Sequence, residues 1–233
     1  MLETWTQASG GALHEEPLLL RVNRAGAFGS AETYPGGSVR QALFTYLCGA
    51  PNPALFAARP ELFFGKWLVC MSAEWAAFVR EKPLETTMRR IMMQPRLGAS
   101  LKALKPLPSG YRISGFTPEI FAAHPFGQGQ NYPDFADFAC LGAGAAVLCG
   151  DKVVAAASSF LMHENDVELD VATDPDHRRK GLADHCVARM LNDCTARGLT
   201  VHWDAQNTAS ANIATAHGFV EAQEYAVYVL KEG

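Results

Sequence analysis

The alternation of apolar and polar residues is most regular in the second half of the chain. Three successive runs predict half-buried strands at residues 143–149, 153–163 and 167–172. Short polar segments of the hairpin-turn type separate them, Gly150-Asp151-Lys152 and Glu164-Asn165-Asp166. The other elements expected here are strands at 111–113, 199–203 and 225–230 and helices at 118–123, 184–197 and 210–217. Because three antiparallel strands precede a helix and a strand parallel to the third, the pattern predicts an α+β fold on a mixed α/β sheet.

The first half has a weaker pattern, which we also interpret as α+β. Residues 38–48 predict a short helix capped by Ser38, and residues 66–71 predict a strand. Ser72 is expected to cap a second helix, while residues 86–93 fit a helix or a strand. Pro106, Pro108, Ser109 and Gly110 cluster after this half. We therefore expect an N-terminal region at residues 1–105 and a second domain at residues 106–233.

Composition narrows the class of protein. Six scattered cysteines without a CxxC pair are typical of reduced thiols in a cytoplasmic protein. The chain has no apolar run long enough for a membrane span, and its seven histidines lack the spacing of metal ligands, so we expect neither a membrane nor a metal partner. A net charge of −4 argues against a nucleic-acid partner.

The distribution of charge singles out one turn. Residues 106–233 carry 16 Asp and Glu but only 8 Lys and Arg, and three of these bases are consecutive, Arg178, Arg179 and Lys180. They lie between the strand at 167–172 and the helix at 184–197, in a turn that contains Gly181. The N–H groups at such a helix N-terminus are free to bind an anion. A phosphate-bearing cofactor is the expected occupant.

Two motifs in this half resemble those of a known family. Arg178-x-x-Gly181-x-Ala183 resembles the pyrophosphate-binding signature of the GCN5-related N-acetyltransferases, the GNAT superfamily. Trp203-Asp204-Ala205-Gln206-Asn207 is similar to the family's second cofactor element, and Gly218-Phe219 closes the next helix as in the family. The Trp203-Asp204-x-x-Asn207-x-x-Ser210 form and the long N-terminal half resemble the branch that includes zwittermicin-resistance-type acetyltransferases.

The resemblance implies a GNAT fold in which the strands at 167–173 and 199–203 splay apart around the pantetheine arm of acetyl-CoA. It implies that this co-substrate is bound by Val171, Ala172, Thr173, Arg178, Arg179, Lys180, Gly181, Leu182, Ala183, Asn207 and Ser210. Tyr132 and Ser159 are candidate substrate contacts, although they also fit as ordinary loop and strand residues. Asp204 is a third candidate substrate contact.

The chemistry of acetyl transfer points to further residues. An alkylamine, with a pKa of roughly 10, must lose a proton before it attacks. Glu168 and Asp170 alternate onto one strand face and are candidate bases, although they also fit as solvent-facing carboxylates. The tyrosine that protonates the leaving thiolate in many family members falls at Ala214 here. Tyr225, His217, Asp204 or a water molecule could replace it, and we take Tyr225 as the candidate.

The sequence thus predicts an N-acetyltransferase that moves an acetyl group from acetyl-CoA to a small-molecule amine by direct attack in a ternary complex. Residues 1–105 would supply part of the acceptor pocket or the surface of a homodimer. Because Ala214 replaces the usual acid, the alternative is a non-catalytic acyl-CoA-binding sensor or interaction module on the same fold.

Overall fold

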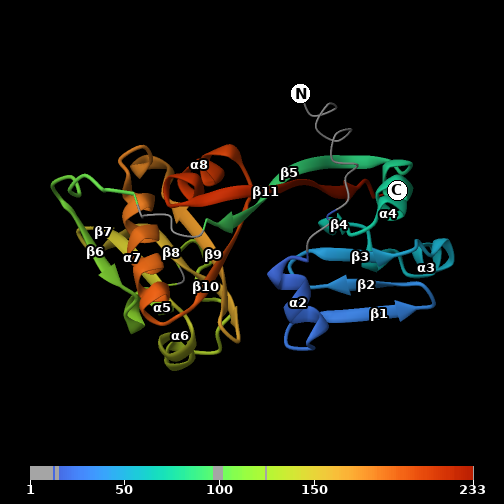
Figure 1. Ribbon diagram of the computed structural model, residues 1–233, viewed down its shortest axis with the longest axis horizontal. Coiled ribbons are helices and arrows are strands. Elements are labelled where there is room, and N and C mark those ends of the chain that lie inside the picture. The colour runs from blue at the N-terminus through green and yellow to red at the C-terminus, as the bar shows by residue number, and fades with distance from the viewer. Residues whose placement is uncertain (1–12, 14–15, 97–101, 124, 233) are drawn as a thin grey trace. The chain divides into compact units, whose positions relative to one another are not determined.

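The chain forms two compact units. The computed structural model describes residue 13 and residues 16–96, 102–123 and 125–232. Residues 1–92 and 221–233 make up the first unit, and residues 93–220 make up the second. Two long neighbouring strands, β5 (Leu84–Pro95) and β11 (Phe219–Leu230), contain the boundaries between the units (Figure 1). The final strand therefore begins in one unit and ends in the other.

Strands dominate the first unit. They are β1 (Ser30–Tyr34), β2 (Gly37–Gln41), β3 (Thr45–Gly49) and β4 (Leu68–Cys70). The first three form an antiparallel meander, in blue in Figure 1, and β4 runs parallel to β3. β11 pairs antiparallel with β4, Val227 opposite Val69. This pairing joins the end of the chain to the N-terminal strands.

The prediction of a helix at residues 38–48 is wrong. These residues form β2 and β3, in which Val39 pairs with Leu47 and both side chains are fully buried. Gly37 pairs with Gly49, whose φ is +72°, and a Cβ on Gly49 would lie 2.2 Å from the carbonyl oxygen of Gly36. Close pairing between the two strands outweighs the local helical spacing of apolar residues.

Short helices cover this unit: α2 (Leu18–Arg24), α3 (Pro53–Ala58), the 3-10 helix η1 (Pro60–Leu62) and α4 (Ala73–Arg80). The cap expected at Ser72 is confirmed, since its Oγ accepts a hydrogen bond from the Trp75 N–H at 3.2 Å. Trp75 is fully buried in an apolar cluster that includes Phe63, Leu68 and Tyr228. The core of the first unit therefore combines α4 with strands from both ends of the chain.

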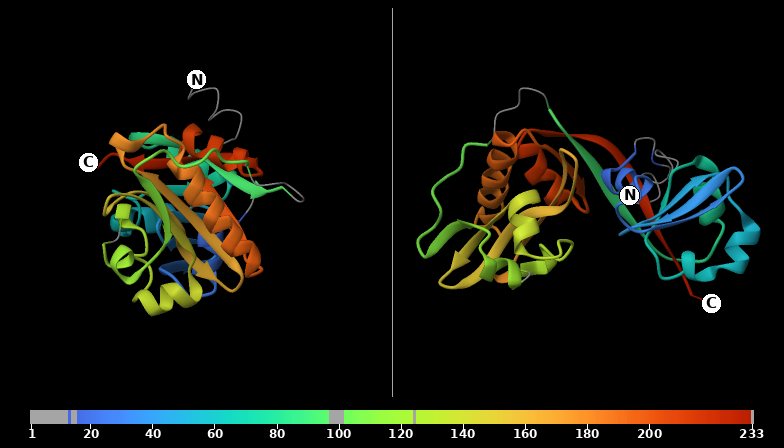
Figure 2. Two further views of the ribbon diagram at one scale, coloured as in Figure 1. Left: turned by 90° about the vertical axis from the view of Figure 1, so that its left-hand side faces the viewer. Right: turned by 90° about the horizontal axis from the view of Figure 1, so that it is seen from below.

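The second unit has the expected mixed sheet. Its strands are β6 (Tyr111–Gly115), β7 (Gly144–Cys149), β8 (Lys152–His163), β9 (Asp166–Thr173) and β10 (Thr200–Ala205). They lie in the order β10-β9-β8-β7-β6, with antiparallel pairs from β6 to β9 and a parallel pair between β9 and β10. The helices are α5 (Pro118–Ala122), α6 (Phe135–Leu141), α7 (Leu182–Ala196) and α8 (Thr208–Ala216), with a 3-10 turn η2 (Pro125–Gly127). The helix α7 packs along β7 and β8, as Figures 1 and 2 show in orange.

The two parallel strands separate soon after they begin. The pairing of β10 with β9 covers three positions, at which Thr200, Val201 and His202 lie opposite Asp166, Val167 and Glu168. From Leu169 to Thr173, β9 continues to pair only with β8 among the described strands. The backbone of this part of β9 therefore has one edge without a strand partner, as expected for splayed central strands.

Candidate functional site

The turn between β9 and α7 is fixed by one carboxylate. Asp174 caps a short 3-10 helix, η3 (Pro175–His177), by accepting a hydrogen bond from the Asp176 N–H at 3.0 Å. Its other oxygen accepts from Lys152 Nζ at 2.7 Å. The hydrogen bonds from Lys152 and Asp176 lower the pKa of Asp174. The carboxylate is thus held in its charged form, and the turn is tied to the start of β8.

The end of this turn leaves the N-terminus of α7 open. Gly181 is the N-cap residue, with φ +74° and no side chain to accept from the first helical N–H groups. A Cβ on Gly181 would meet nothing nearer than Asp184 Oδ2 at 4.0 Å. Arg178, Arg179 and Lys180 are exposed beside it, and Arg179 also has a left-handed φ of 63°. An open helix N-terminus beside three cations fits a diphosphate group.

Hydrogen bonds orient two of the cations. Lys180 Nζ donates to Tyr111 Oη at 2.8 Å, and a 2.9 Å hydrogen bond joins Tyr111 Oη to His177 Nδ1. Arg178 Nε donates to the Thr173 carbonyl at 3.3 Å. The sequence gives no sign of Tyr111, because its partners lie 66 and 69 residues away. These bonds limit the freedom of Lys180 and Arg178 before any ligand arrives.

The other predicted cofactor contacts lie on both sides of this turn. Val171, Ala172 and Thr173 are half-buried in the part of β9 that has one unpaired edge. Leu182, the first residue of α7, is buried and Ala183 is partly buried, so their backbone N–H groups rather than their side chains are available to a ligand. The structure brings these residues together with Gly181, and their role in binding stays a prediction.

The two candidate bases lie where β9 leaves β10. Glu168 is 8% exposed and is the last residue of β9 that pairs with β10. Asp170, two residues on, is half-buried and lies opposite Ser158 of β8. Since side chains two apart in a strand share a face, Glu168 and Asp170 lie on one side of the sheet at this point. Their role in proton transfer stays a prediction.

The Gly-rich loop at residues 126–133 is attached to the sheet beside Asp170. Gln128 is 2% exposed, and its Nε2 donates to the carbonyls of Ala156 at 3.1 Å and Asp170 at 3.0 Å. In the same loop Tyr132 is 9% exposed and donates to Ser159 Oγ at 2.7 Å. Burial raises the pKa of Tyr132, which keeps its hydroxyl protonated and able to donate.

Ser159 is fully engaged within the protein. Its Oγ accepts from Tyr132 and from the Ala143 N–H at 3.1 Å, and it donates to the Ala143 carbonyl at 3.3 Å. These bonds give Ser159 and Tyr132 a clear structural role in joining the loop to β8. Substrate contact by either residue stays a prediction.

Asn207 is both a helix cap and a free donor. It is the N-cap of α8, and its Oδ1 accepts from the Ser210 N–H at 2.9 Å. Asn207 is exposed, so this bond fixes the amide with its Nδ2 available to a ligand. Ser210 is turned inward, where its Oγ accepts from Trp203 Nε1 at 3.0 Å. Asp204, the third candidate substrate contact, is half-buried on β10.

Asn207→Asp is expected to separate the two roles of this residue. The aspartate keeps an oxygen for the Ser210 N–H but lacks the Nδ2 donor and adds a negative charge. We expect its unfolding midpoint in urea to match the wild type, while its dissociation constant for CoA rises about tenfold. Asn207→Ala removes the cap as well and is expected to cost about 1 kcal/mol of stability. Wild-type CoA affinity in Asn207→Asp would remove Asn207 from the site.

A buried histidine joins α7 to the end of α8. The His217 side chain is 0% exposed, and its Nε2 lies 3.1 Å from Asp184 Oδ1 in the first turn of α7. Lys102 Nζ also pairs with Asp184 at 3.1 Å. Burial lowers the pKa of His217, while the hydrogen bond to Asp184 opposes this shift. The pair ties the Gly181 turn to α8, and neither motif in the sequence indicated it.

This histidine predicts that the protein loses stability in acid. His217 takes up a proton near its usual pKa of 6.5 when unfolded but only at lower pH when folded. Its contribution is therefore complete above that usual pKa and is lost as the pH falls through the lower, folded pKa. We expect the urea midpoint to fall between about pH 7.5 and about pH 5.5, and to fall less in His217→Gln, which retains a donor toward Asp184. An equal fall in both proteins would contradict this prediction.

The candidate general acid lies in the other unit. Tyr225 belongs to residues 221–233 and is 1% exposed. Ala214, where the family tyrosine would fall, is fully buried on α8. The role of Tyr225 stays a prediction. Within the described part of the chain, no group of three His, Cys, Asp or Glu residues is placed to hold a metal ion. No described helix is long and apolar enough to cross a membrane.

Comparisons with known proteins match a larger part of the chain than the two motifs cover. A model of the GNAT acetyltransferase family matches residues 31–228. YdfB, an uncharacterized N-acetyltransferase of Bacillus subtilis (strain 168), is 31% identical over 136 residues, which are 55% of this chain and 52% of YdfB. The chain thus matches about half the length of that relative. The family match begins near β1, so it includes most of the half in which the sequence showed no motif.

Two solved structures share the fold of the chain. A GCN5-related N-acetyltransferase-like protein from Streptococcus suis 89/1591 has a TM-score of 0.77 at 21% identity, over 99% of this chain and 100% of that one. A GCN5-related N-acetyltransferase from Kribbella flavida has a TM-score of 0.56 at 16% identity, over 94% and 97%. The GNAT fold expected from the sequence is confirmed.

Proposed function

Since the chain belongs to the GNAT acetyltransferase family, and is therefore an acyltransferase, we propose that it transfers the acetyl group of acetyl-CoA to the amine of a small molecule. The amine attacks directly in a ternary complex of both substrates. The observation that carries the choice of donor is the open N-terminus of α7 at Gly181, flanked by Arg178, Arg179 and Lys180.

Different residues around this opening would bind different parts of acetyl-CoA. The N–H groups from Arg179 to Ala183 would hold the diphosphate, and Asn207 Nδ2 would donate from the start of α8. The unpaired edge of β9 from Val171 to Thr173 would bind the amides of the pantetheine arm. Acetyl-CoA supplies an acetyl group activated as a thioester. An N–H near Val171 would donate to the thioester oxygen as negative charge develops there.

The acceptor amine needs a base and a negative environment. Glu168 and Asp170 would take its proton, and Tyr225 would return a proton to the leaving thiolate. The 16 acidic residues of the second half against 8 basic ones would attract a protonated amine. Tyr132, Ser159 and Asp204 would contact the acceptor.

The wider proposal keeps the two regions expected from the sequence. Residues 106–233 would form the acetyl-CoA domain, and residues 1–105 would complete the acceptor pocket or form the surface of a homodimer. The Trp203-Asp204-x-x-Asn207-x-x-Ser210 form supports a place near the zwittermicin-resistance-type acetyltransferases. The scattered, largely buried cysteines support a cytoplasmic protein.

Release of the CoA thiol tests this function. The purified protein would be mixed with acetyl-CoA and a panel of polyamines, amino sugars, amino acids and amine-bearing antibiotics, and free thiol would be measured with a chromogenic disulfide. We expect thiol release with at least one amine, and a product heavier by one acetyl group. CoA binding in calorimetry without transfer to any amine would instead favour a non-catalytic acyl-CoA sensor.

A further inference from the structure

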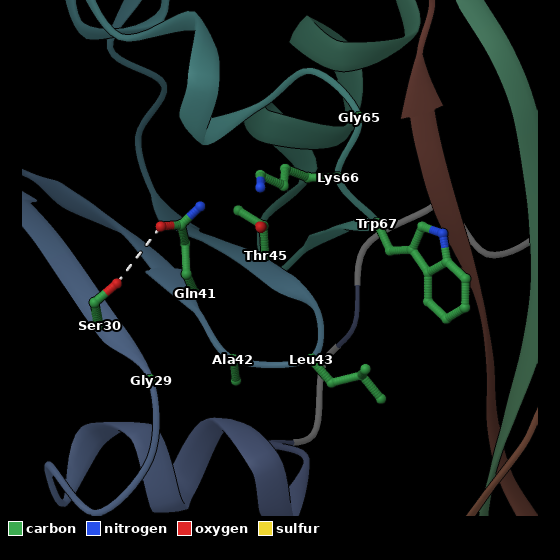
Figure 3. Close-up of a pocket in the computed structure, with 9 residues that line it drawn as sticks. All are labelled: Gly29, Ser30, Gln41, Ala42, Leu43, Thr45, Gly65, Lys66 and Trp67. Carbon is green, nitrogen blue, oxygen red and sulfur yellow. Dashed lines mark hydrogen bonds between the residues drawn. The ribbon is translucent and has the colours of Figure 1, made fainter. Parts of the chain in front are cut away.

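The first unit carries a pocket that shares no lining residue with the proposed acetyl-CoA site. It is open to solvent and has a volume of about 520 Å³, within the range of small-molecule sites. Its lining comes from the start of β1, the β2–β3 turn and the segment before β4, and consists of Gly29, Ser30, Gln41, Ala42, Leu43, Thr45, Gly65, Lys66 and Trp67 (Figure 3).

The backbone around the pocket is fixed by a buried amide. Asn23 is 5% exposed, and its Nδ2 lies within hydrogen-bond distance of the carbonyls of Phe28, Ser30 and Gln41, at 2.9, 3.1 and 3.1 Å. Gly29 packs so closely that a Cβ would lie 1.9 Å from the Gln41 carbonyl oxygen. The pocket wall is therefore formed before any ligand binds, which lowers the entropic cost of binding.

The polar side chains in the pocket can all donate hydrogen bonds. Lys66 has no ion-pair partner among the described residues. Gln41 Oε1 accepts from Ser30 Oγ at 3.5 Å, which leaves Nε2 to donate. Figure 3 shows the Gln41 amide and the Lys66 ammonium pointing toward one another, with Thr45 nearby. An ammonium, an amide and a hydroxyl around one space favour a carboxylate ligand.

The lining also contains two exposed apolar residues, whose side chains point away from Gln41 and Lys66 in Figure 3. Leu43 is 48% exposed and Trp67 is 42% exposed, and both belong to the pocket lining. The Trp67 ring also contacts Phe44, with ring centroids 5.8 Å apart. Large apolar side chains that remain exposed beside convergent polar groups are typical of a binding surface.

We propose that this pocket binds a small carboxylate that bears an aromatic or branched apolar group. The carboxylate accepts hydrogen bonds from Lys66 and Gln41, and the apolar group extends along the lining toward Trp67 and Leu43. Binding at this site does not depend on acetyl transfer. A protein that binds no carboxylate here could still transfer acetyl groups, and a protein without acetyl transfer could still bind the carboxylate.

Ligand-observed NMR on the full chain tests the site, with phenylacetate, 3-phenylpropionate and isovalerate as probes at millimolar concentration. We expect at least one of the three to bind, while phenylacetamide, which lacks the charge, and acetate, which lacks the apolar group, bind at least about tenfold more weakly. Lys66→Met and Trp67→Ala are expected to weaken the best probe by at least about tenfold.

Lys105→Met is the matched control, because it removes an exposed lysine outside the pocket. It is expected to bind the best probe like the wild type. Since Lys66 and Trp67 are exposed, their variants should fold, and a circular dichroism spectrum with a thermal midpoint checks this. Binding of none of the three probes, or wild-type affinity in folded Lys66→Met, would overturn the proposal.

Discussion

Gly181→Glu is expected to abolish CoA binding. The substitution places a carboxylate over the open N-terminus of α7, where the first N–H groups have no side-chain cap. It sets negative charge against the diphosphate and lets the new carboxylate occupy the same N–H groups. We expect the dissociation constant for CoA in calorimetry to rise at least about 100-fold.

Gly150→Glu is the matched control. Gly150 also has a positive φ, +59°, and no atom within 4 Å of an added Cβ, but it lies in the turn between β7 and β8. The two variants therefore share the charge and the backbone strain of a non-glycine residue with positive φ. If both variants weaken CoA equally, or if Gly181→Glu binds like the wild type, the diphosphate lies elsewhere.

The features predicted correctly from sequence are those that depend on neighbours along the chain. Ser72 caps α4 by accepting a hydrogen bond from an N–H three residues on. The turn at Gly181 follows from one glycine between a strand and a helix. Such signals act within a few residues, so a single sequence carries them in full.

Two features that depend on the pairing of strands were missed. Residues 38–48 have apolar spacing that fits a helix, but the pairing of Val39 with Leu47 makes them two strands. The return of β11 to β4 depends on Val227 meeting Val69, and neither residue marks the other in the sequence. Contacts between strands far apart leave no local pattern, because only the folded sheet brings them together.

The same limit applies to the candidate site. The sequence indicates the cations at 178–180, but the hydrogen bond from Lys180 to Tyr111 joins residues 69 apart. The pair of His217 with Asp184 spans 33 residues. Both contacts join the Gly181 turn and the start of α7 to residues outside that segment. Local motifs therefore indicate the candidate site, and the tertiary structure shows which distant residues contact it.

Glu168→Gln is expected to remove most of the acetyl transfer while leaving CoA binding intact. At 8% exposure Glu168 is shielded from solvent, at the last position where β9 pairs with β10. Bulk water cannot readily replace a shielded proton acceptor, so the isosteric amide should lower kcat by about 100-fold or more. Asp170→Asn, at a more exposed carboxylate, is expected to have a smaller effect, because water can reach the amine there.

The pH dependence of the rate separates a base from a structural residue. If Glu168 accepts the amine proton, the fall of kcat/KM in acid reports its protonation, and this fall should be absent in Glu168→Gln. Glu164→Gln removes an equivalent charge from the exposed turn before β9 and should keep both the rate and the profile. A Glu168→Gln enzyme that is slow but retains the wild-type acid limb would show that Glu168 positions the strands, and the base would then be sought at Asp170.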